Sequence, residues 1–436
     1  MNTTKEIRFT IHPEQQGQYL SIPFEMPERI GKFTLRYEYP QNRFAENEIE
    51  NGRFCERRHL NTIDLGLVAP GNRQIAATGS DKKSITITES WATPGCSPTP
   101  LVAGTWQIMA GAYRVAAESV EVHYSLQFEE KEPLWLSGDL HTHTLASDGS
   151  KTAPELCLHA QSQGLDFIAI TDHNQFIRAA SLPQLPGFTA IPGVEWTHYR
   201  GHSNFLGLEE PYDAPFFCND ADEAIRRFRS AHERGALIVI NHPHDEGVPF
   251  TYPLESLPYD CVEIWNGPMR LSNLQAIAAW QACLVQGQKQ IAVCGSDYHE
   301  DHLFQILGGP SIRVYAESRS AADILDALRR GHSYFVYQAH GPKLEMQCAG
   351  APLGSSLPWK AGLMLSLQME GLQAGDEVRL VGKMGSQTVH QAQSAGNLRL
   401  DVPVREPGFL RLELWRSLYP GIPALPLLLS NPIWFD

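Results

Sequence analysis

The chain has few cysteines and no long apolar segment. Its 436 residues include 8 cysteines, no two of which are spaced as C-x-x-C. Sparse thiols of this kind are typical of reduced cytoplasmic proteins and argue against a disulfide framework. No run of about 18 apolar residues is present, and the N-terminal residues lack the apolar core of a signal peptide. The sequence therefore predicts a soluble, cytoplasmic protein without a membrane span.

An excess of positive charge is also missing. Lys and Arg total 35 against 49 Asp and Glu, which gives a formal net charge of −14. A chain with this balance lacks the broad basic surface that binds a phosphate backbone, so we expect no extended nucleic-acid partner. Internal repeats and low-complexity tracts are absent, and the hydrophobic fraction of 42% is that of a globular protein. At roughly 100–200 residues per domain, this length predicts two to four domains.

Histidine, in contrast, is concentrated in one part of the chain. Eleven of the 17 histidines fall between His141 and His302, and the long flanks share the other six. Because histidine is the commonest metal ligand, we expect the chemistry of this protein in the middle third of the sequence.

Three segments differ in their hydrophobic periodicity. Residues 1–133 alternate apolar and polar side chains, as in Phe33–Tyr39, and Pro-Gly turns separate the alternating runs, which predicts a β-sandwich. Residues 134–339 alternate apolar runs with amphipathic helical patterns, which predicts a parallel α/β barrel or a doubly wound sheet. Residues 340–436 return to strand patterns alone, as in Phe409–Leu414, and predict a second, smaller β domain.

Start and stop signals predict three helices in the middle segment. Each begins with a capping residue followed three positions later by an acidic residue, and each ends at a glycine. The capping pairs are Thr152 with Glu155, Asp220 with Glu223 and Ser320 with Asp323, and the glycines are Gly164, Gly235 and Gly331. The apolar runs that alternate with the helices are residues 165–171, 236–241, 261–265 and 291–295. Such runs are typical of strands that are buried on both faces.

Potential metal ligands follow the ends of the strand-like runs. His141 and His143 are two residues apart, so in a strand both imidazoles leave the same face and can hold one cation. In isolation, such an H-x-H pair fits a hydrogen-bonded strand end equally well. Further polar groups are Asp148, Asp172 with His173, Glu195 with His202 shortly after it, His242, and Asp297 with His299.

The shared position of these groups argues for one site. In α/β barrels, side chains at the carboxyl ends of different strands converge on one mouth. Five strand ends here carry His/His, Asp/His, Glu, His and Asp/His. Chance, or a purely structural role for each residue, rarely places so many potential ligands at equivalent positions. The sequence therefore predicts a metal centre, and its mixed imidazole and carboxylate ligands suit zinc, manganese or iron alike.

With these motifs, residues from about Leu134 to Tyr337 resemble the polymerase and histidinol phosphatase (PHP) superfamily. The shared stretches are H-x-H, S-D-G, T-D-H, G-V-E, N-H-P and S-D-x-H, all of which occur around the residues named above. The flanks are similar to the stand-alone branch that includes carbaryl-hydrolase-like proteins, through residues 63–67, 104–106 and 430–433. Amidohydrolases also begin with H-x-H, but the bridging Glu195 and the D-x-H pair favour the PHP family.

The resemblance implies a distorted (β/α)7 barrel, flanked by N-terminal and C-terminal β-sandwich-like domains, with two or three divalent metal ions. The implied ligands are His141, His143, Glu195 and Asp297 for one ion, Glu195, His242 and His202 for a second, and Asp148, His173 and His299 for a third. Asn204 lies on the same side of its strand as His202 and is the alternative ligand. Asp172 is expected to orient a neighbouring histidine.

The resemblance also implies metal-dependent hydrolysis of a small molecule. Phosphate mono- or diesters are the expected substrates, and carbamates, esters or amides are the alternative, because a hydroxide held between two cations can attack phosphorus or carbonyl carbon. A scaffold without activity is less consistent with the nearly complete ligand set. Candidates for holding a phosphate are Lys151, Arg178, Arg200 and Arg270, and candidate proton donors are His198, His244 and His302.

Overall fold

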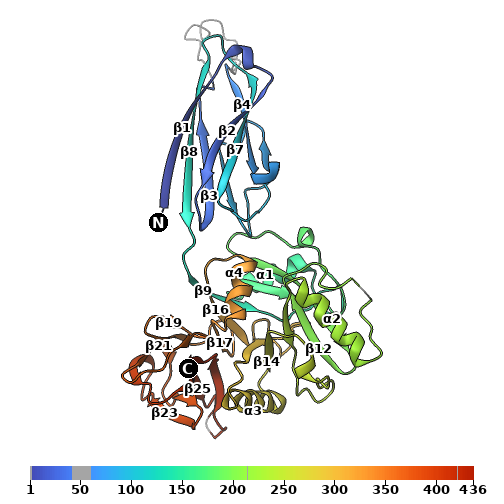
Figure 1. Cartoon of the computed structure of the whole chain (residues 1–436), viewed down its shortest axis with the longest axis vertical. Helices are drawn as coiled ribbons and strands as arrows, with labels where there is room; N and C mark the ends of the chain where they lie inside the picture. The colour runs from blue at the N-terminus through green and yellow to red at the C-terminus, as the bar shows by residue number, and fades with distance from the viewer. Residues whose placement is uncertain (1, 42–59, 214, 420) are drawn as a thin grey trace. The chain divides into compact units, whose positions relative to one another are not determined.

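The computed structural model describes residues 2–41, 60–213, 215–419 and 421–436. The chain forms two compact units, Met1–Glu132 and Pro133–Asp436, and Figure 1 shows the elements of each. The N-terminal unit has strands throughout its described part, while the second unit combines strands with four α-helices in the residues described.

The N-terminal unit is a sandwich of two antiparallel four-stranded sheets. One sheet has the order β1 (Asn2–Ile11), β8 (Val120–Glu130), β3 (Ile30–Glu38) and β6 (Ser84–Thr88). The other has the order β2 (Tyr19–Met26), β7 (Gly104–Arg114), β4 (Thr62–Ala69) and β5 (Arg73–Thr78). Alternating residues of both sheets, among them Phe33, Trp106 and Tyr124, are buried in one shared core, which is the physical result of the period-2 pattern in the sequence.

The second unit is built on a mixed sheet in which two parallel sets of strands are joined by an antiparallel one. The first part of its order is β15 (Ile291–Gly295), β14 (Cys261–Asn266), β13 (Leu237–Ile240), β12 (Gly201–Leu206), β11 (Thr189–His198), β10 (Phe167–Ile170), β9 (Leu134–Asp139), β16 (Ser311–Ala316) and β17 (Ser333–Val336). Strands β9 to β11 are parallel, as are β13 to β15, whereas β12 is antiparallel to both of its neighbours.

The C-terminal strands continue this same sheet. Strand β26 (Leu425–Ser430) pairs with β17, and β25 (Gly408–Arg416), β22 (Glu377–Gly382) and β23 (Gly385–Gln391) follow in order. Strands β20 (Ser356–Leu357) and β27 (Ile433–Phe435) join the sheet beside β25. A separate four-stranded sheet contains β19 (Ala351–Pro352), β18 (Lys343–Cys348), β21 (Met364–Leu372) and β24 (Gly396–Pro403).

The mixed α/β class agrees with the sequence, but the finer architecture differs from a simple alternation of strands and helices. The hairpin of β11 and β12 has no helix between its strands, and β16 is antiparallel to β9. The distorted (β/α)7 barrel therefore stays a prediction, as do the domain boundaries at residues 133 and 339.

Four helices lie in the described part of the second unit: α1 (Ala153–Ser162), α2 (Ala221–Glu233), α3 (Leu271–Val285) and α4 (Ala321–Arg329). The three predicted caps are present, because the side chains of Thr152, Asp220 and Ser320 each accept a hydrogen bond from the third residue of their helix. Helix α3 begins after Arg270 without a side-chain cap, so no start signal indicated it. None of the described helices is long and apolar enough to cross a membrane.

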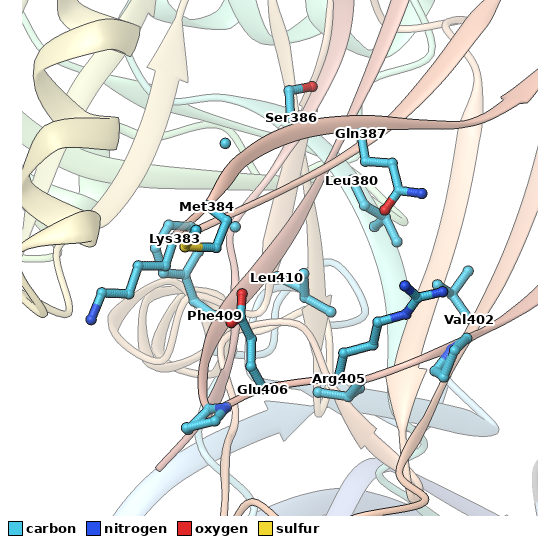
Figure 2. A pocket seen from close by; sticks show the side chains of 15 residues that line it. Leu380, Lys383, Met384, Ser386, Gln387, Val402, Arg405, Glu406, Phe409 and Leu410 are labelled. Carbon is cyan, nitrogen blue, oxygen red and sulfur yellow. The ribbon is translucent and has the colours of Figure 1, made fainter.

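An open pocket lies at the β22–β23 hairpin, as Figure 2 shows. Its wall combines the apolar side chains of Leu380 and Phe409 with the charged side chains of Lys383, Arg405 and Glu406. All of its lining residues belong to the C-terminal strands and their loops, so it is separate from the histidine-rich strand ends.

Candidate metal centre

The candidate ligands lie on segments that extend the parallel pairing beyond the strand ends. Thr142 forms a parallel bridge with Tyr298, and His173 forms one with Glu195. In addition, the Thr171 N–H donates to the Thr142 carbonyl at 2.9 Å. These contacts align the segments after β9, β10 and β15 with β11, so that side chains from four strands meet at one edge of the sheet.

The Glu195 carboxylate lies at the centre of this cluster and is fully buried. Three imidazole nitrogens surround its Oε1 atom: His141 Nε2 and His202 Nδ1 at 3.2 Å, and His242 Nε2 at 3.4 Å. Asn241 Nδ2 donates a hydrogen bond to the same oxygen at 2.8 Å. This half of the carboxylate therefore faces histidines that follow β9 and β13 or belong to β12.

The second oxygen of Glu195 faces a different set of imidazoles. Oε2 lies 2.8 Å from His173 Nδ1 and 3.6 Å from His143 Nε2. Asp297 supplies another carboxylate nearby, because its Oδ1 is 3.1 Å from His143 Nε2 and 3.3 Å from His141 Nε2. The two oxygens of Glu195 thus point at two separate groups of nitrogen ligands, which is the arrangement that a bridging carboxylate requires.

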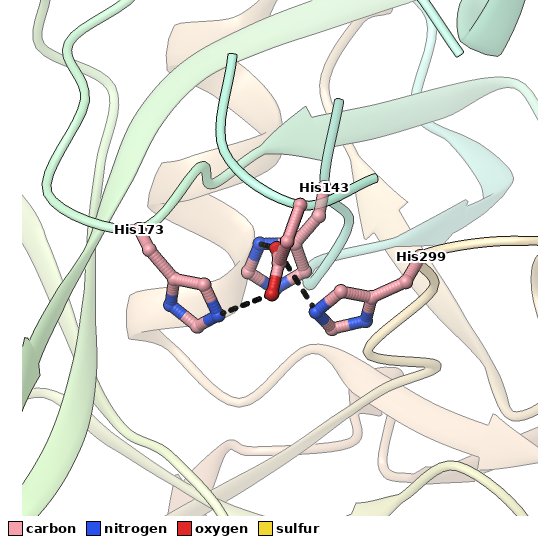
Figure 3. A group of neighbouring side chains, drawn as sticks. His143, His173 and His299 are labelled. Carbon is pink, nitrogen blue, oxygen red and sulfur yellow. Dashed lines mark ion pairs between the residues drawn. The ribbon is translucent and has the colours of Figure 1, made fainter. Parts of the chain in front are cut away.

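A further group surrounds Asp148, on the more open side of the cluster. Figure 3 shows the imidazoles of His143, His173 and His299 turned toward a common space. Asp148 Oδ1 is 3.3 Å from His299 Nε2, and Asp148 Oδ2 is 3.6 Å from His173 Nε2. The Asp148 side chain is 55% exposed, whereas Glu195 is buried, so this group is the one that solvent reaches.

The residues present fit a divalent cation. Among the described residues, His141 Nε2 and Glu195 Oε2 are buried polar atoms without a hydrogen-bond partner. Their neighbours are close, but at angles that make no hydrogen bond. Buried polar atoms are nearly always satisfied, and a cation shared by imidazole and carboxylate lone pairs would satisfy these two.

The electrostatics of the cluster favour ionised carboxylates. Burial raises the pKa of Glu195, but the imidazoles of His141, His173 and His202 outweigh it and hold that pKa well below its usual range. Burial likewise raises the pKa of Asp297, and the charge on His141 outweighs it, so this pKa is also lowered. Conversely, burial lowers the pKa of His141, but the surrounding carboxylates raise it well above normal. In the metal-free protein the ionised carboxylates are therefore balanced by protonated imidazole, and a bound cation would replace that proton.

All nine predicted ligands lie in this cluster, but they group differently from the division that the resemblance implies. The sets whose ligand atoms lie within 4.8 Å of one another are His143, Asp148, His173 and His299; His141, His143 and Glu195; His141, His242 and Asp297; and His173, Glu195 and His202. The assignment of each residue to a particular ion stays a prediction.

Comparison with known families agrees with this arrangement. Residues 139–239 match the family model of the PHP domain. These residues are therefore similar to PHP domains. The matched range includes the H-x-H pair after β9, the T-D-H stretch after β10 and the glutamate on β11. The more specific similarity to the carbaryl-hydrolase-like branch stays a prediction.

The similarities to solved structures are weaker. A two-domain protein from Bacteroides vulgatus ATCC 8482, which contains a predicted PHP-like metal-dependent phosphoesterase, is 20% identical; the match covers 69% of this chain and 95% of that one, with a TM-score of 0.39. An amidohydrolase from Chromobacterium violaceum with bound sulfate and no metal is 15% identical; the match covers 44% and 96%, with a TM-score of 0.29. No curated protein matches the sequence.

Two polar residues beside the cluster have structural partners. Asn204 Nδ2 donates to the Leu140 carbonyl at 3.1 Å, and its Oδ1 accepts from Asn241 at 2.9 Å, so Asn204 joins strands while His202 faces Glu195. Asp172 accepts hydrogen bonds from the Thr144 backbone and from Ser147, instead of from a histidine. It therefore fixes the loop after His143 and orients no imidazole directly.

Two of the four cationic candidates, Lys151 and Arg270, lie beside the cluster and are held by hydrogen bonds. Lys151 Nζ donates to the Tyr298 hydroxyl and pairs with Asp301, both at 2.8 Å. Arg270 Nη2 donates to Asn266 Oδ1 at 2.8 Å and lies 3.5 Å from Asp245. Of the other two, Arg200 donates to Thr251 and stacks on the Tyr252 ring, and Arg178 precedes a short 3-10 turn.

The candidate proton donors differ in their surroundings. The His198 ring contacts the Cys218 carbonyl through Nε2 at 2.9 Å and the Tyr252 hydroxyl through Nδ1 at 2.9 Å. Both ring nitrogens of His198 are therefore engaged in the fold. His244 and His302 are exposed on the loops after β13 and β15, and His302 Nδ1 accepts a hydrogen bond from the Phe304 backbone N–H at 3.5 Å.

The sequence analysis missed Glu263, a buried carboxylate on β14. Its Oε1 lies 3.1 Å from His141 Nδ1, on the opposite side of that ring from Glu195. A signal was available, because Glu263 is a charged residue inside the apolar run 261–265, and a buried carboxylate needs a partner.

Backbone strain also gathers at this site. Asn174, His242 and Asp297 are non-glycine residues with φ values of 51°, 26° and 53°. This left-handed region is unfavourable for side chains other than glycine and persists only where the surroundings enforce it. His242 and Asp297 are themselves candidate ligands, and Asn174 follows the candidate ligand His173, so the strained positions lie at the ligands.

Proposed function

We propose that this protein is a metal-dependent hydrolase that acts on phosphate mono- or diesters. The observation that carries this proposal is the position of Glu195, whose two oxygens face separate groups of imidazoles. This arrangement suits a carboxylate that bridges two divalent ions of zinc, manganese or iron. When bound, such ions supply an activated water at neutral pH and withdraw charge from the substrate.

The chain's own residues would divide the remaining work. His141, His143, His242 and Asp297 would hold one cation beside Glu195, and His173 with His202 would hold the other. Asp148, His173 and His299 form the exposed group, which would hold a further cation or contact the substrate. Because Asp148 is the most exposed carboxylate of the cluster, substrate would approach from this side.

The preference for phosphate rests on the cationic side chains near residues 297–299. Lys151 donates a hydrogen bond to Tyr298, which lies in the sequence between the candidate ligands Asp297 and His299. Arg270 is held by Asn266, whose amide Nδ2 lies 3.4 Å from Asp297 Oδ2. Two fixed positive charges at the rim would stabilise the negative charge that develops on a phosphoryl group. His302 and His244 are the candidates for protonating the leaving group.

The finer fold is part of the same proposal. The strands from β9 to β15 would close as a distorted (β/α)7 barrel, which is supported by contacts of β15 with β16 and β17 at the far end of the strand order. Closure of this kind brings the strand ends into one mouth.

The test is a substrate panel with the protein loaded separately with Zn²⁺, Mn²⁺ and Fe²⁺. The panel contains phosphomonoesters, phosphodiesters, carbamates, carboxylic esters and amides, and metal content is measured on the same samples. We expect chelator-sensitive turnover of phosphate esters. Turnover of carbamates or other carbonyl substrates alone would refute the phosphoesterase assignment. A protein that binds no divalent cation would refute the hydrolase.

A further inference from the structure

Glu263 has three hydrogen-bonding neighbours within a fully buried setting. Its side chain is 2% exposed, in the middle of β14. Oε1 contacts His141 Nδ1 at 3.1 Å, while Oε2 accepts from the His242 backbone N–H at 2.9 Å and from Asn266 Nδ2 at 3.1 Å. Burying a carboxylate is costly unless it is paired in this way, so a specific role explains why the strand carries one.

The contact with His141 determines which nitrogen of that ring can bind a cation. A carboxylate only accepts hydrogen bonds, so the proton of a neutral His141 lies on Nδ1, facing Glu263. The lone pair is then on Nε2, which lies 3.2 Å from Glu195 Oε1 and 3.3 Å from Asp297 Oδ1. Glu263 thereby turns the free nitrogen of His141 toward the other ligands.

The contact with His242 acts on the backbone. His242 has a φ of 26°, in a region that a histidine avoids, and the hydrogen bond from its N–H to Glu263 helps to hold it there. Its Nε2 lies 3.4 Å from Glu195 Oε1. One carboxylate therefore orients two imidazoles, and both belong to the set formed by His141, His242 and Asp297.

Gly295, which has no side chain, leaves room for the contact between Glu263 and His141. A Cβ atom there would lie 2.8 Å from Glu263 Oε1 and closer still to the Cβ of His141. Any side chain at position 295 would push the carboxylate and the imidazole apart. The glycine is thus a second, independent feature that serves the contact between Glu263 and His141.

We propose that Glu263 is a positioning residue that sets the affinity of one cation site, the site formed by His141, His242 and Asp297. This inference rests on the proposed metal centre, and it assigns to Glu263 no contact with the cation or the substrate. The Asp148, His173 and His299 group makes no contact with Glu263 in the described residues, so it should not depend on Glu263.

The decisive variant is Glu263→Gln, which keeps the shape and removes the charge. A glutamine places an N–H₂ group where only acceptors are useful, so it must face the His141 proton, the His242 N–H or the Asn266 amide. We expect the affinity of one site for Mn²⁺ or Zn²⁺ to fall by about 10–100-fold, as is typical when a partner of a metal-bound histidine is lost. Chelator competition and metal stoichiometry measure this directly. Glu233→Gln, at the exposed end of α2, is the matched control.

His299→Ala provides the complementary comparison. It should weaken the exposed group and leave the Glu263-dependent site at its original affinity, while Glu263→Gln should do the reverse. If Glu263→Gln lowers the melting temperature of the metal-free protein but leaves the affinity of every site unchanged, Glu263 is merely structural and the inference is wrong. If the unsubstituted protein binds no cation, the proposed function fails instead, so the two failures are distinguishable.

If Glu263→Gln does not fold, Glu263→Asp tests the same inference. The aspartate keeps the charge but withdraws it by one methylene from His141, so it should reduce the affinity of the same site by a smaller factor than glutamine does. Equal affinities of Glu263→Asp and the unsubstituted protein, with the metal-free form folded, would overturn the positioning role.

Discussion

Replacing Glu195 by glutamine keeps the size of the side chain and removes the charge that two groups of imidazoles share. Asn241 Nδ2 donates to Oε1 at 2.8 Å, so the amide oxygen of the glutamine should occupy this position. Its N–H₂ group would then point at His173 Nδ1 and His143 Nε2, which lie near Oε2. An amide nitrogen does not bind a cation, so the site on this side should lose its ion first.

The size of the effect follows from the number of groups that Glu195 joins. It contributes to two of the four ligand sets, those with His141 and His143 and with His173 and His202. Losing both charge and bridge should lower turnover by about 10²–10³-fold, the range observed when a group that stabilises developing charge is removed. Metal content should fall by about one ion per chain.

The assay combines metal analysis after gel filtration with turnover of whichever substrate the panel identifies. Glu233→Gln again serves as the control for loss of one negative charge. Glu195→Gln protein that keeps all of its metal and a near-normal rate would show that the carboxylate bridges nothing. Loss of activity with full metal content would point to a role in substrate binding and would also contradict the bridge.

Three further predictions concern the same cluster. His299→Ala should remove the ion or anion of the exposed group, lowering turnover on the order of 10-fold while part of the metal is retained, and loss of all metal at once would show that the groups are inseparable. In the metal-free protein, the lowered pKa values of Glu195 and Asp297 stabilise the fold at pH values above the unfolded carboxyl pKa of about 4. This contribution is lost as the pH falls toward the folded pKa values, so the free energy of unfolding, measured by urea denaturation across pH 2–7, should decrease below about pH 4. A free energy of unfolding that does not change with pH would refute this prediction. Gly295→Ala should destabilise the fold by about 1–3 kcal/mol in thermal denaturation, since it crowds a packed histidine, whereas Gly396→Ala, with open space, should change little; equal effects would remove the steric argument.

The strand-end ligands could be predicted because their spacing has a geometric meaning. His141 and His143 flank Thr142, which bridges Tyr298, so the two-apart spacing places both imidazoles at one site. Asp297, in contrast, has a φ of 53°, so the spacing of Asp297 and His299 is not that of an extended segment. The caps at Thr152, Asp220 and Ser320 were equally visible, because the capping residue and its partner are close in sequence.

Strand direction and buried partners could not be predicted in this way. The period of an apolar run does not indicate whether β12 and β16 are parallel or antiparallel to their neighbours. Helix α3 begins at Leu271, after Arg270, with no local signal. The role of Glu263 depends on His141, which is far away in the sequence, and only the tertiary fold brings the two together.

The pairing of β17 with β26 has a consequence for how the protein is made. Strand β17 ends at Val336 and β26 begins at Leu425, so one edge of the mixed sheet remains without its partner until the later strand has been synthesised. Asn431 then joins the two sides, since its amide contacts the backbone of Ala292 on β15 and the hydroxyl of Ser333. Until residues 425–430 are present, the edge of β17 has no strand to pair with, and an open edge of this kind is prone to pair with another copy.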